Sequence, residues 1–309
     1  MSVKTASIIP DESHIVFRQL CKLGLAEASS VELLWPRTRD AEIPVLRDRK
    51  SGVILLASIP DLDSHYDEKV IGKSASAEVA TRSGLLRLKR NDDLERRLSQ
   101  TSTLLQGADL CDFGTGQGQF LDEALERCRS VTGVEIRDDL RSMICDRLGG
   151  EVSLLRSLAG RTAQFDLVTL FHVLEHIPDQ LETLREIRSA LRPDGTIFVE
   201  VPHARDFLIA EMQLPDFYDF TFWSEHLVLH TKQSLTAFLQ EAGYTDIRVK
   251  GFQRYGFANH LHWIRHHRPG GHEAFRHLSS ADMDAAYCAH LESLDRTDTL
   301  IATATAGPA

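Results

Sequence analysis

Apolar and polar positions divide much of the chain into short apolar runs separated by amphipathic stretches. Apolar runs occupy 110–113, 130–136, 165–171 and 196–202. Such nearly continuous runs are typical of parallel strands that are buried on both faces. The stretch 179–191 instead carries leucine and isoleucine at helical spacing. This alternation predicts an α/β domain built around a mostly parallel sheet.

Weaker patterns predict further secondary-structure elements in the rest of the chain. We expect a turn at 191–195, and the polar turn within 43–56 predicts a β-hairpin. Further elements are predicted as a charged helix over 82–105 and strands at 151–155, 245–249 and 298–304. The chain is therefore divided into an N-terminal β-rich appendage, 1–76, and a larger domain, 77–309.

Three glycines follow the first apolar run at alternate positions: Gly114, Gly116 and Gly118. Glycine lets the backbone turn tightly and approach a ligand closely, and the helix that follows directs free N–H groups at that ligand. The spacing is not G-x-G-x-x-G, because Gln119 stands at the place of the third glycine, and no G-K-[ST] follows. The acid Asp112 disfavours a pyrophosphate beside the loop and favours an ammonium group.

A second acid, Glu135, ends the next apolar run about twenty residues beyond the glycines. A carboxylate at this place can accept hydrogen bonds from both hydroxyl groups of a ribose. The glycine loop and this acid together predict a site for a nucleoside-containing ligand without phosphate.

These segments resemble the motifs of class I S-adenosylmethionine (SAM) methyltransferases. Residues 112–118 match the glycine motif, and 165–178 match the strand that leads into a Leu-Glu-His-Ile-Pro sequence. Residues 191–195 match the Leu-x-Pro-Gly-Gly turn of the family. The resemblance implies a Rossmann-like fold with a seven-stranded, mostly parallel sheet, SAM as cofactor and S-adenosylhomocysteine as product. The cofactor-binding positions that it implies are Asp112, Gly114, Thr115, Gly116, Gly118, Phe120, Glu135, Ile136, Phe171 and His172. The acid that often follows the third strand of the family is missing from 156–160.

Two insertions, 203–230 and 251–297, distinguish the chain from a minimal domain of this family. We expect them to form a cap at the ligand edge of the sheet, because binding groups gather on connections there. Polar and aromatic residues that could bind an acceptor are His203, Tyr255, Asn259 and His260. A cap helix that packs its own face would explain the last three equally well. The second insertion resembles the sugar-modifying branch of the family.

Methyl transfer to a hydroxyl group needs a base, and histidine is the best-matched side chain near neutral pH. His226 and His176 are the catalytic candidates, although His176 could equally order its own loop through a backbone hydrogen bond. The histidines within 260–277 match no zinc-binding spacing, so no metal site is expected.

Composition narrows the class of partner. The formal net charge of −10 disfavours nucleic acid as a substrate. Five scattered cysteines without a C-x-x-C pair are typical of a reducing cytoplasm, and no apolar run reaches the length of a membrane span. We expect a cytoplasmic protein that acts on a small molecule, and a homodimer is compatible with this composition.

The sequence thus predicts SAM-dependent methyl transfer to a hydroxyl or amine of a small molecule. A sugar or glycan precursor is preferred as acceptor, and a quinone-like or other phenolic metabolite is the alternative. A hypothesis from another class is a non-catalytic SAM-binding sensor or assembly protein. Conversion of SAM to S-adenosylhomocysteine with candidate acceptors would separate the two classes.

Overall fold

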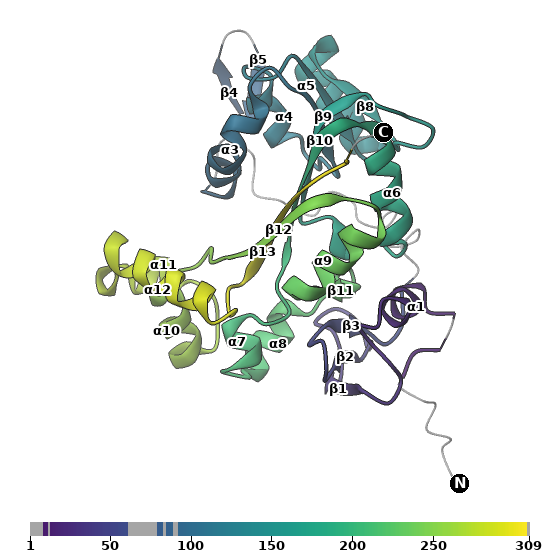
Figure 1. Cartoon of the computed structure of the whole chain (residues 1–309). Coiled ribbons are helices and arrows are strands. Elements are labelled where there is room, and N and C mark those ends of the chain that lie inside the picture. The colour runs from purple at the N-terminus through teal and green to yellow at the C-terminus, as the bar shows by residue number, and fades with distance from the viewer. Residues whose placement is uncertain (1–8, 12, 61–78, 83–84, 89–91, 308–309) are drawn as a thin grey trace.

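A computed structural model of the 309-residue chain describes residues 9–11, 13–60, 79–82, 85–88 and 92–307. Its centre is a seven-stranded sheet in the order β12-β13-β10-β9-β6-β7-β8 (Figure 1). The strands are β6 (Asp109–Phe113), β7 (Ser130–Val134), β8 (Ser153–Leu155), β9 (Phe165–Phe171), β10 (Leu191–Pro202), β12 (Thr245–Phe252) and β13 (Thr299–Thr305). Strand β13 pairs antiparallel with both β10 and β12, and the remaining pairs are parallel. The predicted α/β sheet is therefore confirmed.

Helices cover both faces of this sheet, because successive side chains of a strand point to opposite faces. In β10, Ile197 and Val199 belong to one core cluster and Phe198 to another. The first cluster includes side chains of α6 (Gln180–Ala190) and α9 (Lys232–Glu241). The second includes side chains of α3 (Asp92–Leu105), α4 (Gln119–Ala124) and α5 (Asp138–Leu148). Burial on both faces explains why the central strands are apolar without alternation.

Local capping fixes where the two helices of the first face begin. Asp179 accepts a hydrogen bond from the backbone N–H of Glu182, and this ends the loop after β9. Thr231 and Ser234 form a reciprocal capping box at the start of α9. Both starts agree with the prediction from sequence.

The N-terminal region forms a second, antiparallel sheet in the order β1-β2-β3-β11. Its elements are α1 (Ile15–Lys22), β1 (Val31–Trp35), β2 (Val45–Asp48), β3 (Ile54–Leu56) and β11 (Val228–Leu229). The predicted hairpin is confirmed by the β2–β3 pair, with Val45 opposite Leu56. Strand β11 belongs to the insertion 203–230, so the appendage shares a sheet with the cap. The boundary predicted at residue 76 falls outside the described residues.

One local prediction was wrong, and a second was right about a turn but not about the strand that continues through it. The helix expected over 82–105 begins only at Asp92, because β4 (Val79–Arg82) and β5 (Leu85–Leu88) pair as an antiparallel hairpin. The charges of this segment suggested a solvated helix, whereas cross-strand pairing satisfies its backbone. The turn expected at 191–195 lies inside β10, where the register shifts between Leu191 and Thr196. Asp194 adopts a positive φ there, so the turn is a bulge within a longer strand.

The insertions form a cap at the carboxyl end of the sheet, as expected (Figure 1). Its helices are α7 (Phe207–Ala210), α8 (Pro215–Thr221), α10 (Phe257–His266), α11 (Gly271–Ala274) and α12 (Ala281–Ser293). Among the described helices, none combines the length and the apolar composition that a bilayer crossing requires.

A buried carboxylate ties α3 to the end of the central sheet. Glu200, in β10, is fully buried and accepts hydrogen bonds from Arg96 Nη1 at 2.6 Å and Arg97 Nη2 at 2.9 Å. Its Oε1 also lies 3.1 Å from His172 Nε2. Burial opposes ionisation of Glu200, but these partners hold its pKa well below the usual range. The carboxylate is therefore charged and fully paired at neutral pH.

Replacing this carboxylate by an amide should destabilise the fold. Glu200→Gln leaves two guanidinium groups and an imidazole around a neutral side chain, which should cost about 3 kcal/mol of unfolding free energy. The measurement is urea denaturation at pH 7.

The matched control is Glu42→Gln, which removes an exposed partner of Arg37 and should change stability by less than about 0.5 kcal/mol. The depressed pKa of Glu200 implies a contribution that is present above the unfolded carboxyl pKa of about 4.3 and lost on acidification. The variant should thus lose less stability than wild type below that pH. Equal stability of Glu200→Gln and wild type would contradict the account.

Candidate active site

The glycine loop between β6 and α4 folds back onto β7. The backbone N–H groups of Gly114 and Thr115 both donate to the carbonyl of Val134. All three predicted glycines have a positive φ, which other residues rarely adopt. A Cβ at Gly114 would lie 2.5 Å from a methyl carbon of Val173, whereas a Cβ at Gly116 would meet no atom within 4 Å. The loop thus packs tightly at one end and leaves open space at Gly116.

Glu135, at the end of β7, reaches this open part of the loop. Its Oε2 accepts from Gly116 N at 2.9 Å and its Oε1 from Arg137 N at 3.0 Å. Each carboxylate oxygen can accept more than one hydrogen bond, so capacity for further donors remains. The next residue, Ile136, is a large apolar side chain that is 49% exposed. This combination suits a ribose on the carboxylate and an adenine ring against the apolar side chain.

Three other residues that are predicted to contact the cofactor make close contacts with neighbouring side chains of the protein. Asp112 is buried and accepts from Thr169 Oγ1 at 2.6 Å, and burial raises its pKa to about 6. Phe120 and Phe171 pack edge to face with centroids 4.8 Å apart. Arg97 lies over the ring of Phe171 at 4.8 Å. These side chains shape the floor beneath the loop.

His172 lies between two buried carboxylates. Its Nδ1 is 3.1 Å from Glu175 Oε1, and its Nε2 is 3.1 Å from Glu200 Oε1. Burial lowers the pKa of His172, but the two carboxylates more than offset this effect and raise it above the usual value. Its positive φ of 57° is uncommon for histidine and places the ring across the end of β9. The residue therefore joins the Glu200 cluster to a second cluster.

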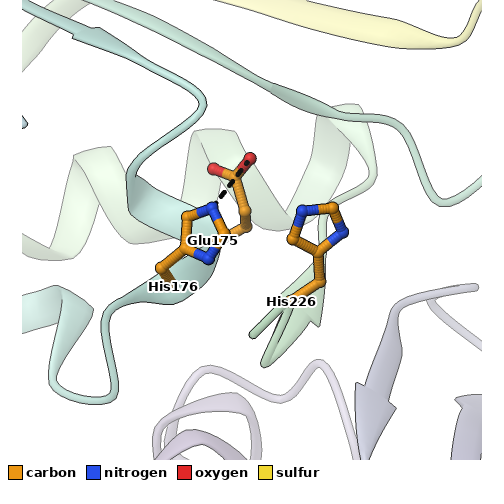
Figure 2. Close-up of side chains that lie close together, drawn as sticks. All are labelled: Glu175, His176 and His226. Carbon is orange, nitrogen blue, oxygen red and sulfur yellow. Dashed lines mark ion pairs between the residues drawn. The ribbon is translucent and has the colours of Figure 1, made fainter. Parts of the chain in front are cut away.

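The second cluster consists of Glu175, His176 and His226, whose ligand-type atoms all lie within 4.8 Å of one another (Figure 2). Both imidazole rings turn a nitrogen toward the carboxylate of Glu175, which is fully buried. The rings of His176 and His226 meet edge to face at 5.0 Å. His176 Nδ1 lies 2.9 Å from the carbonyl oxygen of Glu225, which anchors this ring to the loop before β11.

The pKa values of Glu175 and His226 are both lowered, but for different reasons. Burial opposes ionisation of Glu175, but its bond to His172 and the nearby imidazoles lower its pKa to about 2. Burial lowers the pKa of His226 to about 4, so its imidazole is neutral at pH 7. Its Nδ1 is buried and has no hydrogen-bond partner among the described residues. His226 is thus a neutral imidazole with unused hydrogen-bonding capacity beside a fixed carboxylate.

Two histidines and a glutamate at this spacing could also hold a metal ion, although the sequence suggested no metal site. Among the residues that the structure describes, the histidines within 260–277 form no comparable group. The choice between a proton acceptor and a metal ligand for His226 therefore depends on the charges around the cluster.

A cavity of about 370 Å³ lies between the cap and the ends of the strands, with His226 and His172 in its wall. It brings together all four residues predicted to bind the acceptor: His203, Tyr255, Asn259 and His260. His176 contacts the ring of His226 but does not line this cavity. The structure thus places the predicted residues together, whereas their roles remain predictions.

The four acceptor-side residues differ in how firmly the protein holds them. His203 Nδ1 contacts the carbonyl oxygen of Thr297 at 2.9 Å, and burial lowers its pKa to about 4. His260 Nδ1 bonds the hydroxyl of Tyr287 at 2.8 Å. Among the described residues, none forms a side-chain hydrogen bond with the buried amide of Asn259. Tyr255 is 42% exposed and stands at the rim.

Sequence reasoning missed several parts of this wall. Arg39 comes from the N-terminal appendage, and Trp223 directly precedes the Ser-Glu-His segment that carries His226. Arg254 and Asp298 form an ion pair at 3.3 Å next to the paired ends of β12 and β13. Only the position of Trp223 next to His226 offered a local signal, because the other contacts join distant parts of the chain.

Comparison with known proteins assigns the chain to a family. The family described as "Methyltransferase domain" matches residues 86–249, which is more than half of the chain. Relatives include the ubiquinone biosynthesis O-methyltransferases of Xanthomonas campestris, 33% identical over 104 residues, and Nitrosospira multiformis, 29% identical over 102 residues. These matches cover 31% and 30% of this chain. The chain spans 43% of the length of either relative.

Solved structures with a similar fold include a SAM-dependent methyltransferase from Archaeoglobus fulgidus, with a TM-score of 0.46 and 17% identity over 69% of this chain and 93% of that one. Another is phosphoethanolamine N-methyltransferase 2 of Haemonchus contortus in complex with SAM, with a TM-score of 0.45 and 15% identity over 71% of this chain and 53% of that one. The family match and the seven-stranded sheet with its antiparallel β13 lead to one conclusion. The chain belongs to the methyltransferase-domain family and has the Rossmann-like fold of class I SAM-dependent methyltransferases.

Proposed function

We propose that this protein transfers the methyl group of SAM to a hydroxyl group of a small molecule held in the cavity, with His226 as the base. The observation that carries the proposal is that His226 lines the cavity with a ring nitrogen within 4.8 Å of the buried Glu175 carboxylate. The family match supports the reaction class. The relatives named O-methyltransferase support oxygen as the acceptor atom.

The cofactor side of the proposal rests on the open loop around Gly116. Glu135 would accept the ribose hydroxyls, and Ile136 would cover one face of the adenine. Two backbone N–H groups already fix the largely buried carboxylate of Glu135, and the side chain of Ile136 is exposed beside it in sequence. When bound, SAM supplies an electrophilic methyl group on a sulfonium, which needs no covalent enzyme intermediate.

The chain's own contribution to the reaction is placement and proton removal. The cavity wall would hold the acceptor hydroxyl against His226 while its oxygen forms a bond to the methyl carbon and the carbon–sulfur bond breaks. The hydroxyl proton passes to the neutral His226 imidazole. Glu175 would orient this ring and stabilise the imidazolium, since its carboxylate favours the protonated form of His226.

The surrounding charges favour a proton acceptor over a metal ligand at His226. Glu175 favours positive charge at this ring, whereas His176, His172 and Arg39 disfavour it. The one carboxylate can offset the single charge that a proton brings, but not the two charges of a divalent cation. We therefore assign the cluster to acid–base chemistry. Treatment with a chelator should accordingly leave the rate of transfer unchanged.

The names of the relatives, which refer to ubiquinone biosynthesis, favour a phenolic acceptor over the sugar preferred from sequence. The cap residues Asn259 and His260 suit either ring, because both carry hydroxyl groups. A SAM-binding protein without catalysis is the remaining candidate, and turnover of SAM with any acceptor would exclude it.

Loss of the ribose-binding carboxylate should weaken cofactor binding. Glu135→Ala removes a charge-assisted contact and should reduce SAM affinity by on the order of 2–3 kcal/mol in calorimetric titration. Glu151→Ala, an exposed acid at the end of the next helix, is the matched control and should bind SAM as wild type does. Unchanged affinity in Glu135→Ala would rule out this placement of the ribose.

Loss of the base should slow transfer without affecting the cofactor. His226→Ala should lower turnover about a hundredfold or more while SAM affinity stays within about twofold. Because the pKa of His226 is lowered to about 4, the wild-type rate should rise with pH through that region and stay level above it. A near-normal rate in the variant would assign the base to another residue, and a limb near neutrality would contradict the buried neutral imidazole.

A change in the cavity wall should affect the acceptor alone. Asn259→Ala removes an amide that faces the cavity and should raise the acceptor KM about tenfold, with SAM affinity unchanged. The measurement is steady-state kinetics together with the melting temperature. A lower melting temperature with unchanged acceptor KM would show that Asn259 only packs the cap.

A further inference from the structure

We propose that Arg39 forms a subsite for an anionic group, a carboxylate or a phosphate, on the methyl acceptor. The inference rests on the proposed function, because it assumes that the cavity holds the acceptor. It adds a substrate class that neither the family nor the relatives specify. It also gives the N-terminal appendage a part in recognition.

The protein holds the segment around Arg39 firmly against the cap. Arg39 N donates to the carbonyl of Phe222 at 2.8 Å. Asp40 accepts two hydrogen bonds from Ser224, from its N–H at 2.9 Å and from its hydroxyl at 2.8 Å. Trp35 Nε1 donates to Asp219, which lies on α8. The appendage is thus bonded to the segment 219–224 on both sides of Arg39.

The side chain of Arg39 lies flat on an aromatic ring at the cavity wall. Its guanidinium carbon is 3.3 Å from the centroid of the Trp223 ring, and its Nη1 donates to the carbonyl of Phe220 at 3.2 Å. Stacking and one carbonyl bond fix the plane of the guanidinium and leave most of its five N–H donors for other partners. Such a planar, oriented fork is suited to a carboxylate or a phosphate.

Arg39 also differs from the other charged groups of the cavity, because no carboxylate among the described residues forms an ion pair with it. Arg254 is paired with Asp298. His172 lies between Glu175 and Glu200.

The acid nearest to Arg39 in sequence, Asp40, directs its oxygens to Ser224. Asp206 also lines the cavity, but burial raises its pKa to about 7, which favours its neutral form. An anion at Arg39 would therefore meet a guanidinium that no carboxylate among the described residues contacts, although the charge of Asp40 acts on it from a distance.

The place of this cation relative to the base defines the acceptor. The ring of His226 stacks on Trp223 with centroids 5.9 Å apart and planes 14° apart. Trp223 thus contacts both the guanidinium and the proposed base, and the charge of Arg39 reaches His226. The acceptor we infer carries its anionic group a short way along the molecule from the hydroxyl that is methylated. A hydroxybenzoate and a sugar phosphate both meet this description.

The test measures equilibrium binding without SAM, so it does not depend on methyl transfer. Two anionic probes, protocatechuate and glucose 1-phosphate, are titrated calorimetrically beside their neutral counterparts, protocatechuamide and methyl glucoside. Wild type should bind at least one anion about tenfold or more tightly than its neutral counterpart, and which anion prevails separates carboxylate from phosphate. Arg39→Gln should abolish this preference without weakening binding of the neutral probes, and Arg39→Lys should retain part of it.

The matched control is Arg37→Gln, two residues away, where the arginine side chain is 55% exposed, faces Glu42 and does not line the cavity. It should keep the full preference, and all variants should keep the wild-type melting temperature. Equal binding of charged and neutral probes by wild type would overturn the proposal, as would an anion preference that survives Arg39→Gln. Failure of the proposed function would instead appear as absence of S-adenosylhomocysteine formation with every acceptor, whatever the titrations give.

Discussion

The arrangement of the site depends on one buried carboxylate, Glu200. It holds Arg96 and Arg97 of α3 against the end of β10 and also pairs with His172. His172 also bonds Glu175, and the carboxylate of Glu175 lies beside the ring of His226. One chain of buried charges therefore connects the floor beneath the glycine loop with the wall of the acceptor cavity. A buried charge is tolerated only when it is paired, so each member keeps the next in place.

This chain of charges lets one fold combine two different environments. On the cofactor side, the loop leaves open space at Gly116, where two backbone N–H groups fix the largely buried carboxylate of Glu135. On the acceptor side, burial keeps His226 neutral while Glu175 stays ionised beside it. A neutral base next to a fixed anion is the state that proton removal requires at pH 7. The cap and the appendage then supply walls of the cavity that His226 lines.

Local sequence pattern was sufficient for the sheet, because long apolar runs reflect burial on both faces, and for the helix starts at Asp179 and Thr231, because capping is a local interaction. It failed at β4–β5, where pairing between strands outweighed the charged composition. Within the site, the histidines were visible as motif residues. Glu200 and Arg39 were not, since their roles come from partners about a hundred or more positions away and no periodicity records such contacts.

The most direct test of the whole account is a crystal structure of the protein with S-adenosylhomocysteine bound. The account predicts electron density for the ribose at Glu135, and for the sulfur at the side of the cavity where His226 stands. Glu200 should remain bonded to Arg96 and Arg97 in that complex. A ligand bound elsewhere, or a sulfur separated from the cavity by intact protein, would contradict the claim that the two sides of this site meet at His226.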